Sequence, residues 1–448
     1  MAQLIVSISG IRGIVGDGLG PREAARFGLA FGTHLRGGRV VLGRDSRPSG
    51  PLLADALREG LLATGCSVVD VGILSTPGTS VMVRHLGARG GTIITASHNP
   101  APYNGIKLLS PEGMALSRAD GRAVADLYHR EVFAKVPADR VGTADSFADA
   151  AEIHVERVLG IVRAEPVRAA ALRVAVDAVN GAGGREMRLL LERLGCDAVF
   201  VHDEPTGRFG RGAEPIPENL ADLGQAVRRH RAAVGLALDP DADRLALVDE
   251  TGRAIGEEYT LALACRHRLT QEKGPLAANL STSRLMDDVA NEAGVALYRT
   301  PVGELNVAET IRQKGCLLGG EGNGGVIDPR VAPVRNSLAG AALLLEMMAA
   351  RRKPLSELAA ELPVYWMVKD KVPIAGIRSE AVFEAARKRF PDARVDERDG
   401  LYLAWDRGWL HVRASNTEPI LRILAEAKDE KTARAWVAEI QALVREQA

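Results

Sequence analysis

Three aspartates alternate with other residues in the segment 239–244 (DPDADR). Alternate side chains of an extended segment point to the same side, so the carboxylates of Asp239, Asp241 and Asp243 are expected to crowd together and repel one another. A hard cation would relieve this repulsion, and oxygen-only ligands suit Mg²⁺, which keeps positions open for water or a phosphate oxygen. An EF-hand is excluded because Arg244 stands where that loop requires glycine. The alternative is a solvated acidic turn.

Ser97 lies in the segment 95–100 (TASHNP), directly after the run 91–94 (GTII), which predicts a buried strand. Open α/β sheets bind ligands beyond the carboxyl ends of their strands, so the serine is placed where a reacting group would lie. The next turn, 103–107 (YNGIK), brings Lys107 beside it. The alternative is a polar connection between strand and helix with a capping serine, since Ser, Asn and Pro are common turn residues.

Two hydrolytic alternatives use similar residues. A serine hydrolase is not favoured, because no G-x-S-x-G elbow surrounds Ser97. His98 is adjacent in sequence, and neighbouring side chains of an extended segment diverge, so it is a poor base for that serine. A haloacid-dehalogenase-type phosphatase would use the first aspartate as nucleophile, usually near the first strand, whereas Asp239 lies in the middle of the chain.

Basic residues stand in three further loops. The segment 413–419 (RASNTEP) offers one arginine, hydroxyls, an amide and backbone N–H groups, which together can wrap a phosphate, and Arg422 is close enough to help. Arg12 is presented by the glycine-flanked turn 9–13 (SGIRG). The segment 43–48 (GRDSRP) predicts a structural turn held by ion pairs.

A loose internal repeat indicates the elements that position these loops. A helical pattern ends in glycine and a strand begins at Gly65, Gly195 and Gly294. A later strand in each repeat runs into a polar loop, which contains Ser97, the aspartates or the segment 321–325 (EGNGG). Alternation of strands and helices predicts three related α/β/α units with mixed, mostly parallel sheets and right-handed crossovers.

The end of the chain changes character. The apolar runs 401–405 and 409–413 flank a hairpin turn, and an amphipathic helix over 430–445 follows, which favours a small α+β domain. We expect four domains around one cleft, the last able to hinge. Their predicted ranges are 1–145 with the serine loop, 146–250 with the acidic loop, 251–365 with the third loop, and 366–448 with the phosphate loop.

Composition limits the classes of partner. The 448 residues carry no net charge and only 4% aromatic side chains, so neither nucleic acid nor a membrane surface is favoured as a partner. The four cysteines lie far apart, which indicates neither a zinc site nor a disulfide framework. No signal peptide and no long apolar run is found in the sequence, so a cytoplasmic protein is expected, as a monomer or homodimer.

The motifs TASHNP, YNGIK and DPDADR strongly resemble the phosphoserine and metal loops of the α-D-phosphohexomutase superfamily. This superfamily includes phosphoglucomutases, phosphomannomutases and phosphoglucosamine mutases, and the resemblance covers nearly the whole chain. It implies a phosphoserine at position 97 and one Mg²⁺ bound by Ser97, Asp239, Asp241 and Asp243. It further implies an active-site arginine, a general acid or base and a second proton-transfer candidate, which match Arg12, Lys107 and His98.

The resemblance also implies a set of sugar- and phosphate-binding residues: Arg244, Thr300, Gly303, Glu321, Asn323, Arg413, Ser415, Asn416, Thr417 and Arg422. The EGNGG loop departs from the family's usual pattern there. A second departure is the segment 335–337 (RNS), where relatives commonly have Arg-Asp-Gly.

By resemblance, the expected reaction interconverts hexose 6-phosphate and hexose 1-phosphate through a hexose 1,6-bisphosphate, which also serves as activator. The SISGIRG opening and the EGNGG loop favour glucosamine phosphate. The alternatives are phosphoglucomutase and phosphomannomutase activity within the family, and a metal-dependent sugar phosphatase or a sugar-phosphate sensor outside it. A sensor would be expected to lack Ser97 or one of the aspartates, and all are present.

Overall fold

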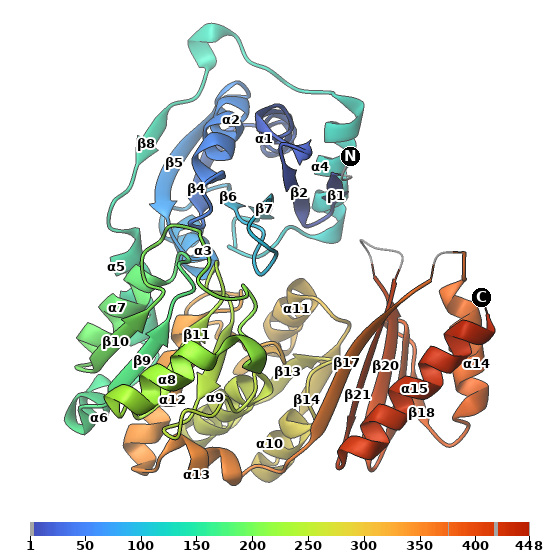
Figure 1. Ribbon diagram of the computed structural model, residues 1–448. Coiled ribbons are helices and arrows are strands. Elements are labelled where there is room, and N and C mark those ends of the chain that lie inside the picture. Colours follow the sequence, from blue (N-terminus) through green and yellow to red (C-terminus); the bar gives the residue numbers. More distant parts are fainter. Residues whose placement is uncertain (1–3, 375, 416–419, 448) are drawn as a thin grey trace.

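The first unit is built on an eight-stranded mixed sheet. The computed structural model describes residues 4–374, 376–415 and 420–447 (Figure 1). The strands of this unit are β1 (Ile5–Ser7), β2 (Gly10–Val15), β3 (Gly18–Leu19), β4 (Gly38–Arg44), β5 (Cys66–Ile73), β6 (Gly90–Ile94), β7 (Tyr103–Leu109) and β8 (Ala144–Ser146). Its helices are α1 (Pro21–Leu35), α2 (Gly50–Leu62), α3 (Thr76–His85) and α4 (Arg118–Arg130), with a 3-10 turn, η1 (Ala138–Arg140).

The second and third units each contain a four-stranded sheet. The second unit comprises α5 (Ala150–Leu159), α6 (Ala164–Ala170), β9 (Arg173–Asp177), α7 (Gly184–Arg193), β10 (Asp197–Val201), η2 (Pro217–Asn219), α8 (Ala221–His230), β11 (Val234–Leu238) and β12 (Leu245–Val248). The third comprises α9 (Glu258–Gln271), β13 (Leu276–Asn279), α10 (Leu285–Ala293), β14 (Leu297–Thr300), α11 (Glu304–Lys314), β15 (Leu318–Glu321), β16 (Gly325–Ile327), α12 (Ser337–Arg351) and α13 (Leu355–Ala360).

One strand order recurs in these three units. The order β5-β4-β6-β7 in the first sheet returns as β10-β9-β11-β12 in the second and as β14-β13-β15-β16 in the third. In each case the first three strands are parallel and the fourth is antiparallel. The prediction of three related α/β units with mixed sheets is confirmed.

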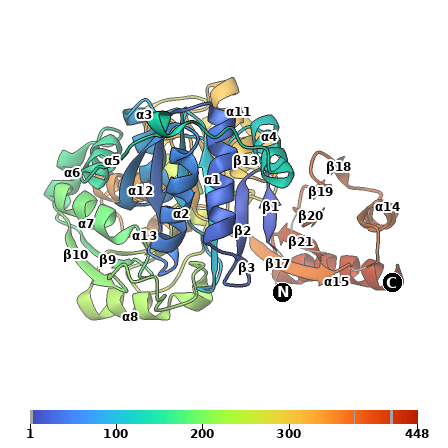
Figure 2. The ribbon, with the colours of Figure 1, turned by 90° about the horizontal axis from the view of Figure 1, so that it is seen from above.

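The fourth unit is an antiparallel sheet with two helices, which confirms the predicted α+β fold with its terminal helix and adds a helix, α14, that was not predicted. It lies to one side of the other three units in both views (Figures 1 and 2). Its elements are β17 (Trp366–Pro373), α14 (Ser379–Arg389), β18 (Arg394–Asp396), β19 (Leu401–Trp405), β20 (Gly408–Ala414), β21 (Ile420–Ala427) and α15 (Glu430–Glu446).

The hydrophobic core joins the second and third units. One cluster of buried side chains extends from α5 through both sheets to α13. The helix α12 lies at its centre against α5, α6, α7 and α9, and its first twelve residues are buried. A helix that is apolar on all sides is expected to be enclosed in this way. Among the described residues, no helix is long and apolar enough to cross a membrane.

Candidate functional site

The predicted loops follow equivalent strands in the repeated units. Ser97 lies between β6 and β7, the aspartates lie between β11 and β12, and residues 322–324 lie between β15 and β16. Each loop therefore connects two antiparallel strands, so the alternative of a connection between strand and helix at Ser97 is not found.

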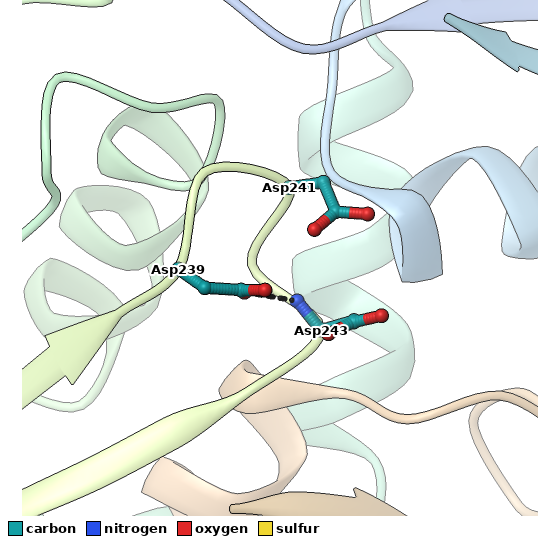
Figure 3. A group of neighbouring side chains, drawn as sticks. All are labelled: Asp239, Asp241 and Asp243. Carbon is teal, nitrogen blue, oxygen red and sulfur yellow. Dashed lines mark hydrogen bonds between the residues drawn. The ribbon is translucent and has the colours of Figure 1, made fainter. Parts of the chain in front are cut away.

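The three aspartates converge through a tight turn (Figure 3). Asp239 Oδ1 accepts the backbone N–H groups of Asp243 and Arg244 at 3.0 and 3.1 Å, and Ala242 has a positive φ of 53°. The predicted extended segment is therefore wrong, but the predicted crowding is found. One carboxylate oxygen of each aspartate lies within 4.8 Å of the others, and all three residues are fully buried.

The donor set fits a divalent cation. The Oδ1 atoms of Asp241 and Asp243 are buried and have no hydrogen-bond partner, an arrangement that is costly unless a cation neutralises it. Burial, followed by repulsion from Asp243 and Asp241, raises the pKa of Asp239 well above its usual value. Burial also acts to raise the pKa of Asp241, but the Lys107 ammonium and hydrogen bonds from Lys107 and Thr76 outweigh it and lower that pKa.

Ser97 meets the acidic loop directly. Its Oγ donates to Asp239 Oδ2 at 3.3 Å, and its side chain and backbone are almost fully buried. The backbone φ of Ser97 is +50°, a conformation that is uncommon for a residue other than glycine and that often marks functional loops. Its N–H is fixed by Thr95 Oγ1 at 2.9 Å. The serine loop and the acidic loop thus form one site.

Arg47 holds the serine loop in this shape. Its guanidinium donates to the carbonyl oxygens of Ser97, Asn99, Pro100 and Tyr103, at 2.7 to 2.9 Å. It also pairs with Asp45 at 3.0 Å, and neither side chain is exposed. The predicted structural ion pair is therefore found between these two residues.

Lys107 lies beside the acidic loop. Its Nζ contacts Asp241 Oδ2 at 2.7 Å and Asp243 Oδ2 at 3.7 Å. Burial acts to lower the pKa of this lysine, but the charges of the two aspartates prevail and raise it. In this environment the Lys107 side chain is an ammonium.

His98 lies closer to the serine than its position in the sequence indicates. Its Nδ1 is 3.5 Å from Ser97 Oγ, so the predicted divergence of the two side chains is wrong, because Ser97 is not extended. Arg244 Nη2 donates to the same Nδ1 at 3.0 Å, and this occupies the imidazole lone pair. Burial and the charges of Arg244, Arg12 and Arg335 lower the pKa of His98 to about 2.

Arg12 and Arg244 border this site from two units. Arg12 Nη1 donates to Asn99 Oδ1 at 2.9 Å, from β2 to the serine loop. Arg244 pairs with Glu214 at 2.8 Å, and its buried Nε has no hydrogen-bond partner. Both arginines therefore hold positive charge beside the serine.

Arg335 connects the acidic loop to the third unit. It donates to Asp243 Oδ2 at 2.6 Å, to Glu304 Oε2 at 2.9 Å and to Glu321 Oε2 at 2.7 Å. Burial acts to lower its pKa, and Asp243 and the two glutamates raise it well above the usual value. In the sequence Arg335 stands out only for its unusual neighbours, because its three partners lie in the acidic loop, at the start of α11 and at the end of β15.

The predicted sugar-contacting residues lie on adjoining loops of the third unit. Glu321 accepts hydrogen bonds from Asn279 Nδ2 and from the N–H of Gly303, at 2.7 and 3.2 Å. With Arg335 on its other oxygen, Glu321 has three protein partners. Thr300 Oγ1 donates to the neighbouring carbonyl of Pro301 at 2.9 Å. Asn323 Oδ1 is buried without a hydrogen-bond partner, so it can accept one from a ligand.

Two arginines of the fourth unit stand opposite each other on β20 and β21. Arg413 pairs in register with Arg422, a placement of like charges that an anion would stabilise. Arg413 Nε also lies 3.2 Å from Asp399 Oδ2, which accepts the N–H of Val302 in the third unit at 2.9 Å. Ser415 follows β20, whereas the predicted residues Asn416 and Thr417 lie outside the described residues.

Four family models match the chain in sequence order. Three are the phosphoglucomutase/phosphomannomutase alpha/beta/alpha domains I, II and III, which match residues 4–135, 152–252 and 256–365. The fourth is the C-terminal domain of the same family, which matches residues 368–443. The chain belongs to the phosphoglucomutase/phosphomannomutase family. The resemblance drawn from the motifs is confirmed.

Archaeal relatives are similar over almost the full length. A Thermococcus kodakarensis protein named "Phosphoglucomutase/phosphomannomutase" is 41% identical, over 96% of this chain and 95% of the relative. A Methanopyrus kandleri protein named "Probable phosphoglucosamine mutase" is 40% identical, over 98% of this chain and 97% of the relative.

Solved structures share the fold of this phosphoglucomutase/phosphomannomutase family member. A crystal structure of a family protein from Burkholderia thailandensis has a TM-score of 0.86 and 27% identity, and covers 98% of this chain and 97% of its own. A structure of Aspergillus fumigatus N-acetylphosphoglucosamine mutase in complex with GlcNAc-6P and magnesium is more distant. It has a TM-score of 0.56 and 17% identity, and covers 83% of this chain and 92% of its own.

Proposed function

We propose that this chain is a phosphohexomutase that interconverts hexose 6-phosphate and hexose 1-phosphate. In the proposed reaction, phosphoserine 97 transfers its phosphoryl group to a free hydroxyl of the sugar phosphate and leaves as a serine hydroxyl. The resulting hexose 1,6-bisphosphate returns its other phosphoryl group to Ser97. The observation that carries this proposal is the contact of Ser97 Oγ with Asp239 Oδ2 at 3.3 Å, which joins the two reactive loops in one buried site.

One Mg²⁺ per chain would be held by Asp239, Asp241, Asp243 and the modified Ser97. The crowded carboxylates and the two unpartnered oxygens support this site, as does the magnesium in the Aspergillus structure. When bound, the ion would neutralise the carboxylates and withdraw charge from the phosphoryl group. Hexose 1,6-bisphosphate would act as activator by phosphorylating an enzyme that has lost its phosphate.

Protein side chains would move the proton and hold the charge. Lys107 is an ammonium beside the acidic loop, so it can protonate the serine oxygen as the phosphoryl group leaves, and the resulting amine can take up the proton that the attacking sugar hydroxyl loses. His98 is a neutral acceptor of the Arg244 hydrogen bond, which makes it a positioning group more than a base. Arg12 and Arg244 would stabilise the negative charge of the transferring group.

The phosphate that does not react would bind to the fourth unit. Arg413 and Arg422 lie side by side on the sheet, and Ser415 follows directly. A planar guanidinium can hold phosphate through two parallel hydrogen bonds. Asn416 and Thr417, which complete the sequence motif, are assigned to the same role.

Glucosamine phosphate is the sugar that we favour. The relatives carry both kinds of name, and most of the archaeal ones are named for glucosamine. Asn323 Oδ1 offers a buried acceptor for an amino or hydroxyl group of the sugar. Thr300, Gly303 and Glu321 would line the same region. Phosphoglucomutase and phosphomannomutase activities are the alternatives, because an amide oxygen accepts from a hydroxyl as well as from an ammonium.

The test is a side-by-side assay with glucosamine, glucose and mannose 6-phosphates, followed by ³¹P NMR. We expect the 1-phosphate to form in each active reaction, without release of inorganic phosphate, and fastest with glucosamine. Stoichiometric release of phosphate would identify a phosphatase instead. Binding of the sugar phosphate without any turnover would identify a sensor.

A further inference from the structure

The acidic loop is held from outside by two different units. In the first unit, Thr76 at the start of α3 donates its hydroxyl to Asp241 Oδ2 at 2.7 Å and its N–H to the carbonyl of Asp241 at 2.9 Å. In the third unit, Arg335 donates to Asp243, and Ser337 Oγ donates to the carbonyl of Ala242 at 2.7 Å. These contacts fix the backbone of the loop as well as two of its carboxylates.

A buried series of hydrogen bonds connects the segment that contains Thr76 to the segment that contains Arg335. Ser75, which precedes Thr76, donates its N–H and its hydroxyl to the two carboxylate oxygens of Glu186 on α7, both at 2.8 Å. Glu186 Oε1 also contacts His154 Nδ1 on α5 at 2.6 Å. His154 Nε2 contacts Asn336 Nδ2 at 2.9 Å, and Asn336 lies directly between Arg335 and Ser337. None of these four side chains is exposed by more than 1%.

The partners in this series of hydrogen bonds determine which nitrogen of the His154 imidazole carries the proton. Asn336 caps α12, and its Oδ1 accepts the N–H of Ala339 at 3.1 Å, so its amide nitrogen faces His154. An amide nitrogen only donates, so His154 Nε2 must accept. The proton of a neutral imidazole is then on Nδ1, where it is donated to Glu186. Each donor in this series of hydrogen bonds therefore faces an acceptor.

We propose that Ser75, Glu186, His154 and Asn336 form a tether that positions the acidic loop for metal binding. This inference rests on the proposed use of a metal at that loop. Because the tether joins the start of α3 to the start of α12, it keeps Thr76 and Arg335 at a fixed separation. That separation sets the distance between Asp241 and Asp243. The residues of the tether touch neither metal nor substrate, so they are positioning residues.

The first variant is Glu186→Gln, which keeps the size of the side chain. A glutamine has one acceptor oxygen, so its NH₂ group must face a donor from Ser75 or His154. Residues behind a metal ligand typically change affinity by about 10- to 100-fold, and we expect the Kd for Mn²⁺ to rise by about tenfold. The value of kcat should fall, while KM for the sugar phosphate should stay unchanged, since the phosphate-binding arginines lie in another unit.

The second variant, Asn336→Asp, separates the tether from simple helix capping. Aspartate caps a helix as well as asparagine does, so a residue that only caps α12 would tolerate the change. Within the tether, an aspartate oxygen would face His154 Nε2, which is also an acceptor, so the hydrogen bond from Asn336 is lost. The Mn²⁺ affinity of this variant should therefore be lower than that of the wild type.

The control is Glu156→Gln on α5, because this exposed glutamate pairs with Arg193 at the end of α7 that lies away from Glu186. Mn²⁺ binding is measured by calorimetry on the full chain, with circular dichroism as a check of folding. Wild-type affinity in a folded Glu186→Gln variant, or in a folded Asn336→Asp variant, would overturn the tether. If Glu186→Gln does not fold, Asn336→Asp decides. A wild-type chain that binds Mn²⁺ but does not isomerise sugar phosphates would refute the mutase proposal and leave the tether intact.

Discussion

At the scale of single residues, the hydroxyl of Ser97 contributes little to the structure of its loop. Ser97 Oγ contacts Asp239 and His98, while the loop itself is held through backbone carbonyls by Arg47. Removal of one hydroxyl from such a loop should leave the packing unchanged. The chemistry of Ser97 and the stability of its loop can therefore be separated by mutation.

We expect Ser97→Ala to abolish mutase turnover, because the variant lacks the oxygen that would carry the phosphoryl group. Metal binding and the thermal midpoint should stay close to the wild type. Intact-mass measurement after incubation with hexose 1,6-bisphosphate should show one added phosphate on the wild type and none on the variant. Ser110→Ala, at the end of β7, is the matched control and should keep both activity and phosphate. Near-wild-type turnover by Ser97→Ala would refute the phosphoserine mechanism.

The residues proposed to act on the substrate are easier to identify from the sequence than the residues that hold them in place. Ser97 and the aspartates stand in short motifs that resemble the loops of a known family. Thr76 and Arg335 contact the same aspartates from positions 165 and 92 residues away along the chain. An arginine or threonine in a polar turn carries no local signal of such a partner. These contacts become visible only when the fold brings the loops together.

At the scale of elements, the three hairpins explain why the loops converge. In each of the first three units, the loop follows the third strand of the recurring order and turns back along an antiparallel fourth strand. The glycines that end helices and the apolar runs predict that strands and helices alternate in three related units. The direction of the fourth strand, and the left-handed residues Ser97 and Ala242 that shape the loops, follow from tertiary contacts and could not be predicted.

The fourth sheet offers a second test at this scale. Because Arg413 and Arg422 are cross-strand neighbours, Arg413→Ala should remove one of the two arginines that are predicted to bind the phosphate. Charge-assisted hydrogen bonds are worth roughly 1.5–3 kcal/mol each, so KM should rise by about 10- to 100-fold. The value of kcat should fall too, because a loosely held phosphate misaligns the attacking hydroxyl.

Phosphorylation of Ser97 by a bisphosphate should still occur in Arg413→Ala, but more slowly, since the reacting end is untouched. Arg394→Ala is the matched control, because this arginine lies on the same sheet and pairs with Asp406 at the surface. Steady-state kinetics on both variants are the measurement. Normal KM and kcat in Arg413→Ala would show that the fourth unit does not bind phosphate through this residue.

At the scale of the whole molecule, polar contacts join the fourth unit to the third. Ser281 Oγ donates to His411 Nδ1 at 2.8 Å, and the N–H of Arg284 donates to Glu426 at 2.8 Å. Lys369, on β17, pairs with Glu257 at 2.9 Å and lies 3.7 Å from Glu258. Such an interface is more polar than a domain core, which is typical of domains that move relative to one another.

Glu258 makes the stability of this interface depend on pH. Burial raises the pKa of the Glu258 carboxyl from 4.5 to about 8, and the nearby Glu257 and Glu426 add to this shift. The Lys369 ammonium and the hydrogen bond from the N–H of Ser283 oppose the shift but do not cancel it. Between these two values the folded chain binds more protons than the unfolded chain, so this group's contribution to stability falls as pH rises. Glu258→Gln mimics the protonated form, so its melting temperature should exceed that of the wild type by more at pH 9 than at pH 6.

The measurement is the thermal midpoint of both proteins from pH 6 to pH 9. Taking the difference between variant and wild type removes the contribution of all other titrating groups. Glu272→Gln, at the exposed end of α9, is the control and should show no such trend. A difference between Glu258→Gln and wild type that stays constant with pH would contradict the shifted pKa.

The acidic loop is where the first three units meet, since Lys107 and Thr76 reach it from the first and Arg335 from the third. A metal bound there should stabilise the folded junction by about 2.7 kcal/mol when its concentration is 100 times its Kd. EDTA should therefore abolish turnover and lower the thermal midpoint, and Mg²⁺ should restore both. Asp241→Asn keeps the shape of the side chain but loses one charge, so the thermal midpoint of this variant should respond little to Mg²⁺. Asp222→Asn, on the exposed face of α8, is the control, and its thermal midpoint should respond to Mg²⁺ as that of the wild type does. If chelation changes neither the rate nor the midpoint, the three aspartates are structural and the proposed mechanism is wrong.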